Sequence, residues 1–289
     1  MTGVSVNRLS FTGGKLVHFG RRVFRGYALV MLGVILAVLL LPLIAPNDPY
    51  QAQFLYRLKA PSWAYPLGTD ALGRCVLSRL IYGAQLTTAS ALLVVICASA
   101  LGSLIGAFAG MAGGLIDRLL MRFCEGMSVF PALAICMIIA GILGLGLKAV
   151  IIALIAVHWT EYARVVRNAV IVERSKPYVM AAVALGARRR RITRRHIFPN
   201  IIGPLLTLAA YSMSWAILSF AGLSFLGLGV EPGTPEWGLM IAESRNYLRD
   251  YPRLVLAPGL TIAAFVVSIN LLGDLLGDRF RLRQINYLH

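Results

Sequence analysis

The stretch LTTASALLVVICASALGSLIGAFAGM, residues 86–111, contains no charged side chain. A helix of about 20 apolar residues crosses the hydrocarbon core of a bilayer, because that core is about 30 Å thick and each residue adds about 1.5 Å. The polarity of these residues does not alternate with the period of two that strands of a transmembrane β-barrel show. The stretch therefore predicts a membrane-spanning helix.

Similar stretches recur along the chain. Of its 289 residues, 58% are hydrophobic and only 14% are charged, against about 25% charged in soluble domains. This composition excludes an ordinary soluble enzyme, and the long apolar stretches exclude a disordered or fibrous chain. The sequence predicts an all-α integral membrane protein with six transmembrane helices. We expect them at residues 26–45, 86–111, 119–143, 149–162, 201–226 and 254–276.

The distribution of Lys and Arg predicts how these helices are oriented. The net charge is +16, and short flanking segments rich in Lys and Arg stay in the cytoplasm. Residues 1–25 carry five basic residues and no acid, whereas 163–200 carry ten basic residues and the single acid Glu173. Residues 1–25 and 163–200 are therefore expected in the cytoplasm. Because the number of predicted spans is even, the C-terminal end is expected there as well. The predicted layout is a cytoplasmic tail (1–25), a first transmembrane helix (26–45), an extracytoplasmic segment (46–85), a five-helix core that includes the cytoplasmic loop 163–200 (86–276), and a second cytoplasmic tail (277–289).

The extracytoplasmic segment contains the stretch LGTDALGR, residues 67–74. Thr69 or Asp70 can cap a helix that begins near Ala71, and apolar residues then recur at helical spacing. This pattern predicts an amphipathic helix near the outer surface of the membrane, and a helix that packs against the spans is the alternative. The residues on its apolar face are Leu72, Val76, Leu80 and Gly83.

The cytoplasmic loop is the most informative segment between the spans. Residues 178–185 form a short apolar run rich in Ala, Gly186 ends it, and residues 188–195 are strongly basic. Small side chains followed by Gly suit a helix that another protein approaches closely. The basic residues can also bind anionic lipid headgroups, at about 1 kcal/mol each. Nucleic acid is disfavoured as a partner, because the basic patch is tethered to a membrane and has no interleaved aromatic residues.

Seven short motifs occur in order along the chain. They are Leu67-Gly68-Thr69-Asp70, Gly73-Arg74, Tyr178-Val179 with Ala181-Ala182 and Gly186, Phe198-Pro199-Asn200, Ser224 to Gly229, Pro235-Glu236-Trp237-Gly238 and Asn270 to Asp274. In this order and on this topology, the chain resembles the second permease subunit of bacterial ABC importers for dipeptides, oligopeptides and nickel. The resemblance extends from the first span to Asp278 and implies the type I ABC importer permease fold.

The resemblance assigns a role to the cytoplasmic loop. In such permeases a coupling helix in this loop docks into a groove on the ATPase subunit. Many members have Glu immediately before the two alanines, where this chain has Met180, which puts any contact made by that carboxylate in question. The resemblance implies ATPase coupling for Tyr178, Ala181, Ala182 and Gly186, and the adjacent Arg188 and Arg189 are candidates for the same contact.

The chain itself is predicted to be non-catalytic. It contains no G-x-x-x-x-G-K-[ST] phosphate-binding loop and no catalytic spacing of Ser, Cys or metal ligands, so no cofactor or metal site is expected in it. The resemblance implies a bacterial inner-membrane complex with a homologous second permease subunit, two ABC ATPase subunits that bind ATP and Mg, and an extracytoplasmic solute-binding protein. Membrane lipid is a further expected partner.

Polar residues within spans are energetically costly and are therefore candidates for function. Arg122 and Glu125 are expected to pair on one face of the third span, and Asn270 and Asp274 lie one turn apart in the sixth. Each pair can form an interhelical clamp or contact the solute, and the clamp is the preferred interpretation. Pro131 predicts a kink in the third span.

The identity of the solute is less clearly indicated than the fold. Peptides are preferred, and nickel or a metal chelate is the alternative, because His158-Trp159 and the following Tyr162-Ala163-Arg164 resemble the nickel branch of the family. His158 by itself is interpreted as a hydrogen-bonding group near a helix end. An ion-coupled secondary transporter is the alternative from another class. Such a transporter requires ionisable groups near the bilayer midplane, whereas the acids here lie near span ends.

Overall fold

The computed structural model describes the backbone of residues 40–285 and most of their side chains, except those of 41, 189–190, 194, 196 and 275–285. The predicted cytoplasmic tail 1–25 and residues 26–39 of the predicted first transmembrane helix, 26–45, lie outside the described residues. Residues 286–289 of the predicted C-terminal tail also lie outside them. The remainder of that tail continues the last helix as far as Ile285.

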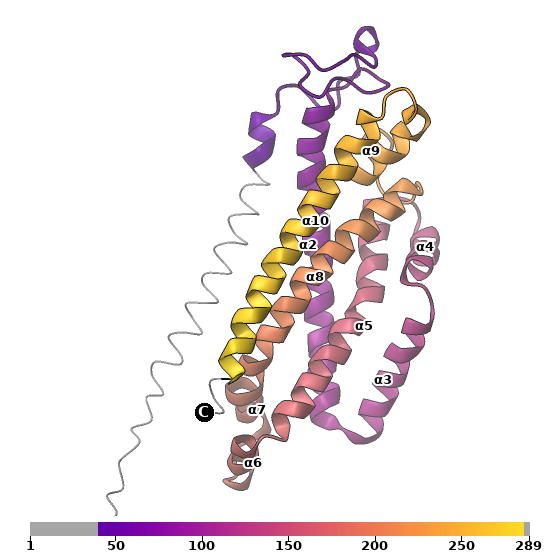
Figure 1. Cartoon of the computed structure of the whole chain (residues 1–289). Coiled ribbons are helices and arrows are strands. Elements are labelled where there is room, and N and C mark those ends of the chain that lie inside the picture. The colour runs from indigo at the N-terminus through magenta and orange to yellow at the C-terminus, as the bar shows by residue number, and fades with distance from the viewer. Residues whose placement is uncertain (1–39, 286–289) are drawn as a thin grey trace, which may run out of the picture. The chain divides into compact units, whose positions relative to one another are not determined.

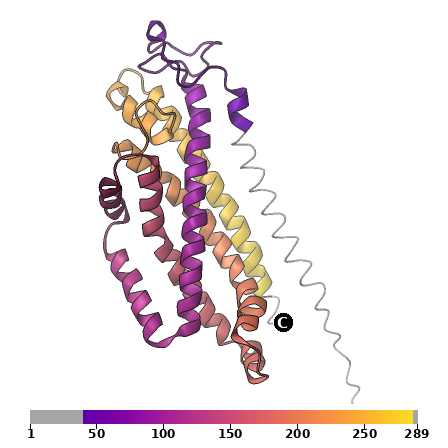
Figure 2. The same cartoon turned by 180° about the vertical axis from the view of Figure 1, so that it is seen from behind.

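Within residues 40–285 the chain is helical, as the sequence predicts, and no strand is present there beyond an isolated bridge between Thr69 and Cys75. Four helices are long and apolar enough to cross a membrane, and a bent helix pair is a fifth candidate. Figures 1 and 2 show α2, α5, α8 and α10 side by side along a common direction. The elements are η1 (Leu41–Ile44), η2 (Phe54–Tyr56), α2 (Val76–Ala112), α3 (Gly114–Val129), α4 (Ala132–Leu143), α5 (Leu147–Arg174), α6 (Pro177–Ala184), α7 (Arg189–Ile192), the π-helical turn η3 (Thr193–Ile197), α8 (Phe198–Phe225), α9 (Trp237–Ser244), η4 (Arg245–Tyr247) and α10 (Arg253–Ile285).

The second span and the predicted amphipathic helix form one helix, α2. It begins at Val76 rather than near Ala71 and continues without a break to Ala112. The Asp70 side chain accepts hydrogen bonds from the backbone N–H groups of Leu72 and Arg74, both at 2.9 Å, so it closes a turn before the helix instead of capping it. Val76 is buried, in agreement with the alternative that this segment packs against the spans.

The third span, predicted as one helix over 119–143, is broken into α3 and α4, which meet at an angle of 93°. Phe130 separates them in an extended conformation, with φ −89° and ψ 145°. The cause is Pro131, because a proline disfavours the helical conformation of the residue before it and cannot continue the preceding hydrogen-bond ladder. The predicted kink is therefore a full break.

The fourth span is longer than predicted. The sequence indicates 149–162, whereas α5 extends from Leu147 to Arg174. The cytoplasmic loop predicted at 163–200 is correspondingly shorter, because its first twelve residues continue α5 and its last three begin α8. What remains between the two helices is α6, α7, η3 and their connections.

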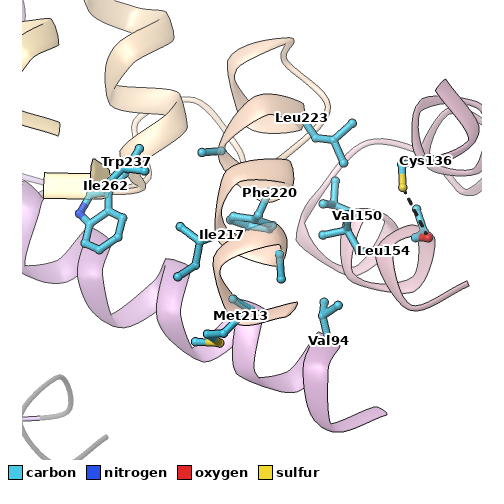
Figure 3. Close-up of a cluster of buried hydrophobic side chains, with 14 of the residues drawn as sticks. Val94, Cys136, Val150, Leu154, Met213, Ile217, Phe220, Leu223, Trp237 and Ile262 are labelled. Atoms are coloured by element: carbon cyan, nitrogen blue, oxygen red, sulfur yellow. Dashed lines mark hydrogen bonds between the residues drawn. The ribbon is translucent and has the colours of Figure 1, made fainter. Parts of the chain in front are cut away.

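The core lies where α2, α5 and α8 meet. Figure 3 shows Phe220 and Ile217 of α8 with Val94 of α2 and Val150 and Leu154 of α5, all of them buried. Cys136 Sγ of α4 lies 3.7 Å from the carbonyl oxygen of Ala153, so α4 also contacts α5. Burial of these apolar side chains against one another holds the helices in register.

Helices α2 and α5 approach closely along a row of glycines spaced four residues apart: Gly102, Gly106 and Gly110. A Cβ built at Gly102 would lie 2.3 Å from the carbonyl oxygen of Trp159, and one at Gly106 would lie 2.3 Å from that of Ala163. Small residues at this spacing let two helix backbones pack directly against each other within a membrane.

Gly106→Val is expected to push α2 away from α5. The atom that blocks the new side chain is backbone and cannot rotate aside, so the free energy of unfolding should fall by about 1–3 kcal/mol. Thermal denaturation of the purified protein in detergent measures this change. Gly126→Val in α3 is the matched control, since nothing lies within 4 Å of its Cβ position. Equal stability of the two variants would contradict the close packing.

The segments predicted to lie on one side of the membrane meet at one end of the bundle. Arg253 Nη2 donates to the carbonyl oxygens of Leu58 and Lys59, at 3.1 and 2.7 Å, which joins the start of α10 to the segment 46–75. We call the end of the bundle at which these segments meet the α9 end (Figure 1). At the opposite end, the α6 end, Arg174 Nη1 donates to the carbonyl oxygen of Gly110 at 2.6 Å.

Candidate functional site

Helix α6 has a defined start and a defined stop. Pro177 occupies its first turn, where the missing N–H leaves no hydrogen bond unmade. At its other end, Gly186 N donates to the carbonyl oxygen of Val183 at 2.9 Å, and Ala187 N donates to that of Ala182 at 3.0 Å. These two bonds form a Schellman motif, which requires a left-handed residue, and Gly186 supplies it with φ +78°.

One face of α6 is anchored in the bundle. Val179 is 1% exposed and belongs to a separate hydrophobic cluster at the α6 end, which we call the Val179 cluster. It brings together side chains from α5, α6, α7, η3 and α8, so it packs α6 against the other four elements. Its buried members are Val166, Val170, Val179, Ile192, Ile197 and Ile201.

Three apolar side chains of α6 and its C-terminal turn are left uncovered by the described chain. Met180 is 60% exposed, Val183 57% and Leu185 88%. We call these three residues the α6 surface. Of the two predicted coupling alanines, Ala181 is exposed and Ala182 is half-buried. A short helix that is held by the buried Val179 and also carries exposed apolar side chains is suited to contact with another protein.

At the start of α6, a buried carboxylate to which the sequence assigned no role joins three segments. Glu173, in the last turn of α5, is 4% exposed. Its Oε1 accepts hydrogen bonds from the hydroxyl of Tyr178 and from Asn200 Nδ2, the latter at 2.8 Å. Its Oε2 lies 2.6 Å from Nζ of Lys176. The available sequence signal was that Glu173 is the single acid among ten basic residues in 163–200.

The two arginines predicted to flank the coupling helix follow Gly186 directly. The side chain of Arg188 is exposed. The side chain of Arg189 lies outside the described side chains, although its backbone begins α7. Their contact with an ATPase remains a prediction.

The predicted pair in the third span does not form. Arg122 and Glu125 are both exposed, and among the ion pairs of the described side chains none joins them. Asp117, five residues before Arg122, is the residue of α3 that forms an ion pair. Its Oδ1 lies 2.8 Å from Nε of Arg167 in α5. The two partners are 50 residues apart in sequence, so local spacing could not reveal them.

The predicted pair in the sixth span makes interhelical contacts. Asn270 Oδ1 accepts a hydrogen bond from the hydroxyl of Ser214 at 2.8 Å, and Asp274 Oδ1 accepts one from the hydroxyl of Tyr211. Both donors belong to α8 and both acceptors to α10. These contacts have the geometry of an interhelical clamp.

His158 lies in the interior of α5 rather than near a helix end. It is buried, and its ring stacks on Trp215 of α8 with centroids 4.3 Å apart and planes 5° from parallel. Its Nδ1 lies 3.5 Å from a carboxylate oxygen of Glu161. In the part of the chain that the structure describes, no three His, Cys, Asp or Glu side chains gather as a metal ion requires.

At the α9 end, two arginines and two acids form what we call the Asp70 network: Asp70, Arg74, Arg79 and Glu243. Asp70 Oδ2 lies 2.7 Å from Nε of Arg74 and 2.6 Å from Nη1 of Arg79. Glu243 Oε2 lies 2.9 Å from a guanidinium nitrogen of each arginine. The network therefore joins the segment before α2 to α9 with balanced charge.

The charge state of Asp70 follows from these contacts. Burial by itself raises its pKa, but the guanidinium groups of Arg79 and Arg74 and the hydrogen bonds from Arg74 outweigh burial. The pKa of Asp70 consequently lies below its ordinary value of 3.8. Asp70 remains a carboxylate at neutral pH, as pairing with two cations requires.

Helix α9 is fastened to α2 by the motif Pro235-Glu236-Trp237-Gly238. The buried carboxylate of Glu236 accepts hydrogen bonds from the N–H groups of Gly238 and Leu239, at 2.9 and 2.7 Å, and so caps the helix. Trp237 Nε1 donates to the carbonyl oxygen of Leu80 at 3.0 Å. The motif therefore acts as a structural joint.

Comparison with known proteins gives a consistent result. Residues 102–285 match the family described as the inner membrane component of binding-protein-dependent transport systems. The chain is 40% identical over 259 residues to the di/tripeptide transport system permease protein DppC of Pseudomonas aeruginosa, covering 88% of this chain and 86% of that protein. It is 38% identical over 233 residues to the nickel transport system permease protein NikC of Escherichia coli K12, covering 81% and 84%.

A solved structure shares the fold. One chain of the inward-facing MetNI methionine ABC transporter matches with a TM-score of 0.59 at 18% identity, covering 70% of this chain and 96% of that chain. The predicted ABC importer permease fold is thus confirmed, as is the resemblance to dipeptide, oligopeptide and nickel permeases. The chain belongs to the family of inner membrane components of binding-protein-dependent transport systems.

Proposed function

We propose that this chain forms part of the solute pathway of an ATP-driven importer and couples that pathway to ATPase subunits through α6. The observation that carries the proposal is the α6 surface. Met180 and Val183 of α6 and Leu185 directly after it stand exposed, although the same helix is held by the buried Val179. Exposed apolar groups on a rigidly held element are typical of a protein contact site.

The proposal includes four kinds of protein in one complex. They are this subunit, a homologous second permease, two ABC ATPases that bind ATP and Mg, and an extracytoplasmic solute-binding protein. This subunit is non-catalytic, and ATP hydrolysis takes place on the ATPases. The α6 end and both termini face the cytoplasm, an orientation supported by the ten basic residues of 163–200. Arg188 and its basic neighbours can also contact anionic lipid.

In this mechanism, ATP binding closes the two ATPases and moves α6. Because the Val179 cluster includes residues of α5 and α8, a displacement of α6 is passed to both spans. The pathway then switches from inward-facing to outward-facing and receives the solute. Hydrolysis resets the ATPases and releases the solute to the cytoplasm.

Di- or oligopeptides are the proposed solutes. Support comes from the relatives named for peptide transport, including the di/tripeptide permease. The nickel permease relative, at 38% identity, makes nickel or a metal chelate the second candidate. An ion-coupled secondary transporter is disfavoured by the family assignment, because that family depends on a binding protein.

The test is to purify the cognate binding protein and identify the ligand that it retains, and then to measure uptake of that ligand into proteoliposomes containing the complete transporter. We expect a peptide, with uptake that requires ATP. Retained nickel or a metal chelate would favour the second candidate. Uptake that persists without the ATPases but collapses with the proton gradient would contradict the importer mechanism.

A further inference from the structure

Glu173 connects three segments through one buried carboxylate. It belongs to the last turn of α5, Tyr178 belongs to the first turn of α6, and Asn200 belongs to the first turn of α8. Lys176, which also contacts Glu173, immediately precedes α6. The C-terminal end of α5, the start of α6 and the start of α8 therefore share a single acceptor group.

Glu173, Tyr178 and Asn200 are hydrogen-bonded to one another. Asn200 Nδ2 donates to Glu173 Oε1 at 2.8 Å and also to the hydroxyl oxygen of Tyr178 at 2.9 Å. The Tyr178 hydroxyl in turn donates to Oε1 of Glu173. Hydrogen bonds to a charged acceptor are roughly twice as strong as those between neutral groups and are directional. They fix the orientation of α6 in a way that apolar contacts do not.

The position of the acid is significant because α6 has none. Met180 stands where the resemblance leads us to expect a carboxylate, and its side chain is 60% exposed. The acid of this segment is instead Glu173, which lies in the last turn of α5 and is 4% exposed. A buried carboxylate is stable only when it is paired and hydrogen-bonded, and Lys176 Nζ, at 2.6 Å, provides the opposite charge.

We propose that Glu173 is the positioning residue that transmits movement of α6 to α5 and α8. This inference rests on the proposed contact between α6 and an ATPase. The Val179 cluster holds α6 by apolar packing, which is non-directional. The Glu173 contacts add directional hydrogen bonds, and displacement of Tyr178 stretches bonds that end on α5 and α8 together. A physical chain of polar contacts therefore runs from α6 into two spans.

The test measures solute transported per ATP hydrolysed by the complete transporter in proteoliposomes. Glu173→Ala should lower this ratio by about tenfold, a typical coupling between distant sites, and Glu173→Gln, which keeps one carbonyl acceptor, should lower it less. The control is Glu231→Ala at the α9 end, an exposed acid, which should leave the ratio unchanged. A purely structural role for Glu173 would reduce the amount of assembled complex and leave the ratio intact, and that result would overturn the proposal.

Two further variants cover the remaining outcomes. If Glu173→Ala prevents assembly, Tyr178→Phe decides, because it removes only the hydroxyl; an unchanged ratio in that variant contradicts the inference. Val183→Asp changes the α6 surface without touching the Glu173 contacts. If Val183→Asp leaves transport intact, the proposed ATPase contact itself is wrong. Val183→Asp can instead abolish transport while Tyr178→Phe and Glu173→Ala leave the amount of solute transported per ATP unchanged. In that case the ATPase contact of α6 stands and only the role of Glu173 is wrong.

Discussion

Asp70→Ala is expected to lower the free energy of unfolding by about 3–5 kcal/mol, because it removes one of the two carboxylates that two buried arginines share. Arg79 is 2% exposed, and its Nη1 lies 2.6 Å from Asp70 and 2.9 Å from Glu243. With Asp70 removed, the two guanidinium groups share only the carboxylate of Glu243. Thermal denaturation of the purified protein in detergent measures the loss.

The control for Asp70→Ala is Asp250→Ala, which removes an exposed acid at the same end of the bundle. That change should alter stability little. The effect of pH provides a second check. Because the pKa of Asp70 is depressed in the folded state, its contribution is complete above the ordinary value of 3.8 and is lost as the pH falls through the folded value. Asp70→Ala should therefore lose less stability on acidification than the unaltered protein; an equal loss would contradict the assigned pairing.

Gly186→Val is expected to reduce ATP-driven uptake by at least about tenfold while membrane insertion stays normal. No atom lies within 4 Å of a Cβ at this position, so a clash within the chain is not the cause. The cause is the backbone, because φ +78° is strained for a β-branched residue. Relief of that strain opens the Schellman motif and displaces Leu185 of the α6 surface. Uptake assays in cells or proteoliposomes measure the effect.

Gly186→Asn distinguishes the backbone explanation from a requirement for bare space. Asn adopts the left-handed conformation more readily than other residues with a side chain, so this variant should keep most of the uptake. If Asn fails as severely as Val, the absence of a side chain at the partner contact is what matters. Normal uptake by Gly186→Val would contradict the coupling role of α6.

The accuracy of the predicted spans depends on what interrupts them. The fifth and sixth were predicted at 201–226 and 254–276, and α8 and α10 begin within three residues of those positions. The fourth was predicted too short, because charged residues such as Arg164 and Arg167 end its apolar run. In the structure Asp117 pairs with Arg167, so the helix continues past the point where hydropathy falls.

The candidate site was predicted in part. The small residues and Gly186 predicted a separate short helix with a glycine stop, and the structure confirms both. Glu173 was noted only as the single acid of a basic loop, because nothing in its neighbourhood shows that Asn200, 27 residues later, lies 2.8 Å from it. The ATPase-contact roles of Arg188 and Arg189 remain predictions.

The sequence by itself determined the class of this protein, where its fifth and sixth spans begin to within three residues, and the family to which it belongs. It could do so because hydropathy and short motifs are properties of neighbouring residues. Only the tertiary structure decided that the third span breaks by 93° at Pro131 and that the Asp70 network joins α2 to α9. It also decided that one buried Glu173 holds α5, α6 and α8 together. These features depend on distances between residues far apart in the chain, which packing alone sets.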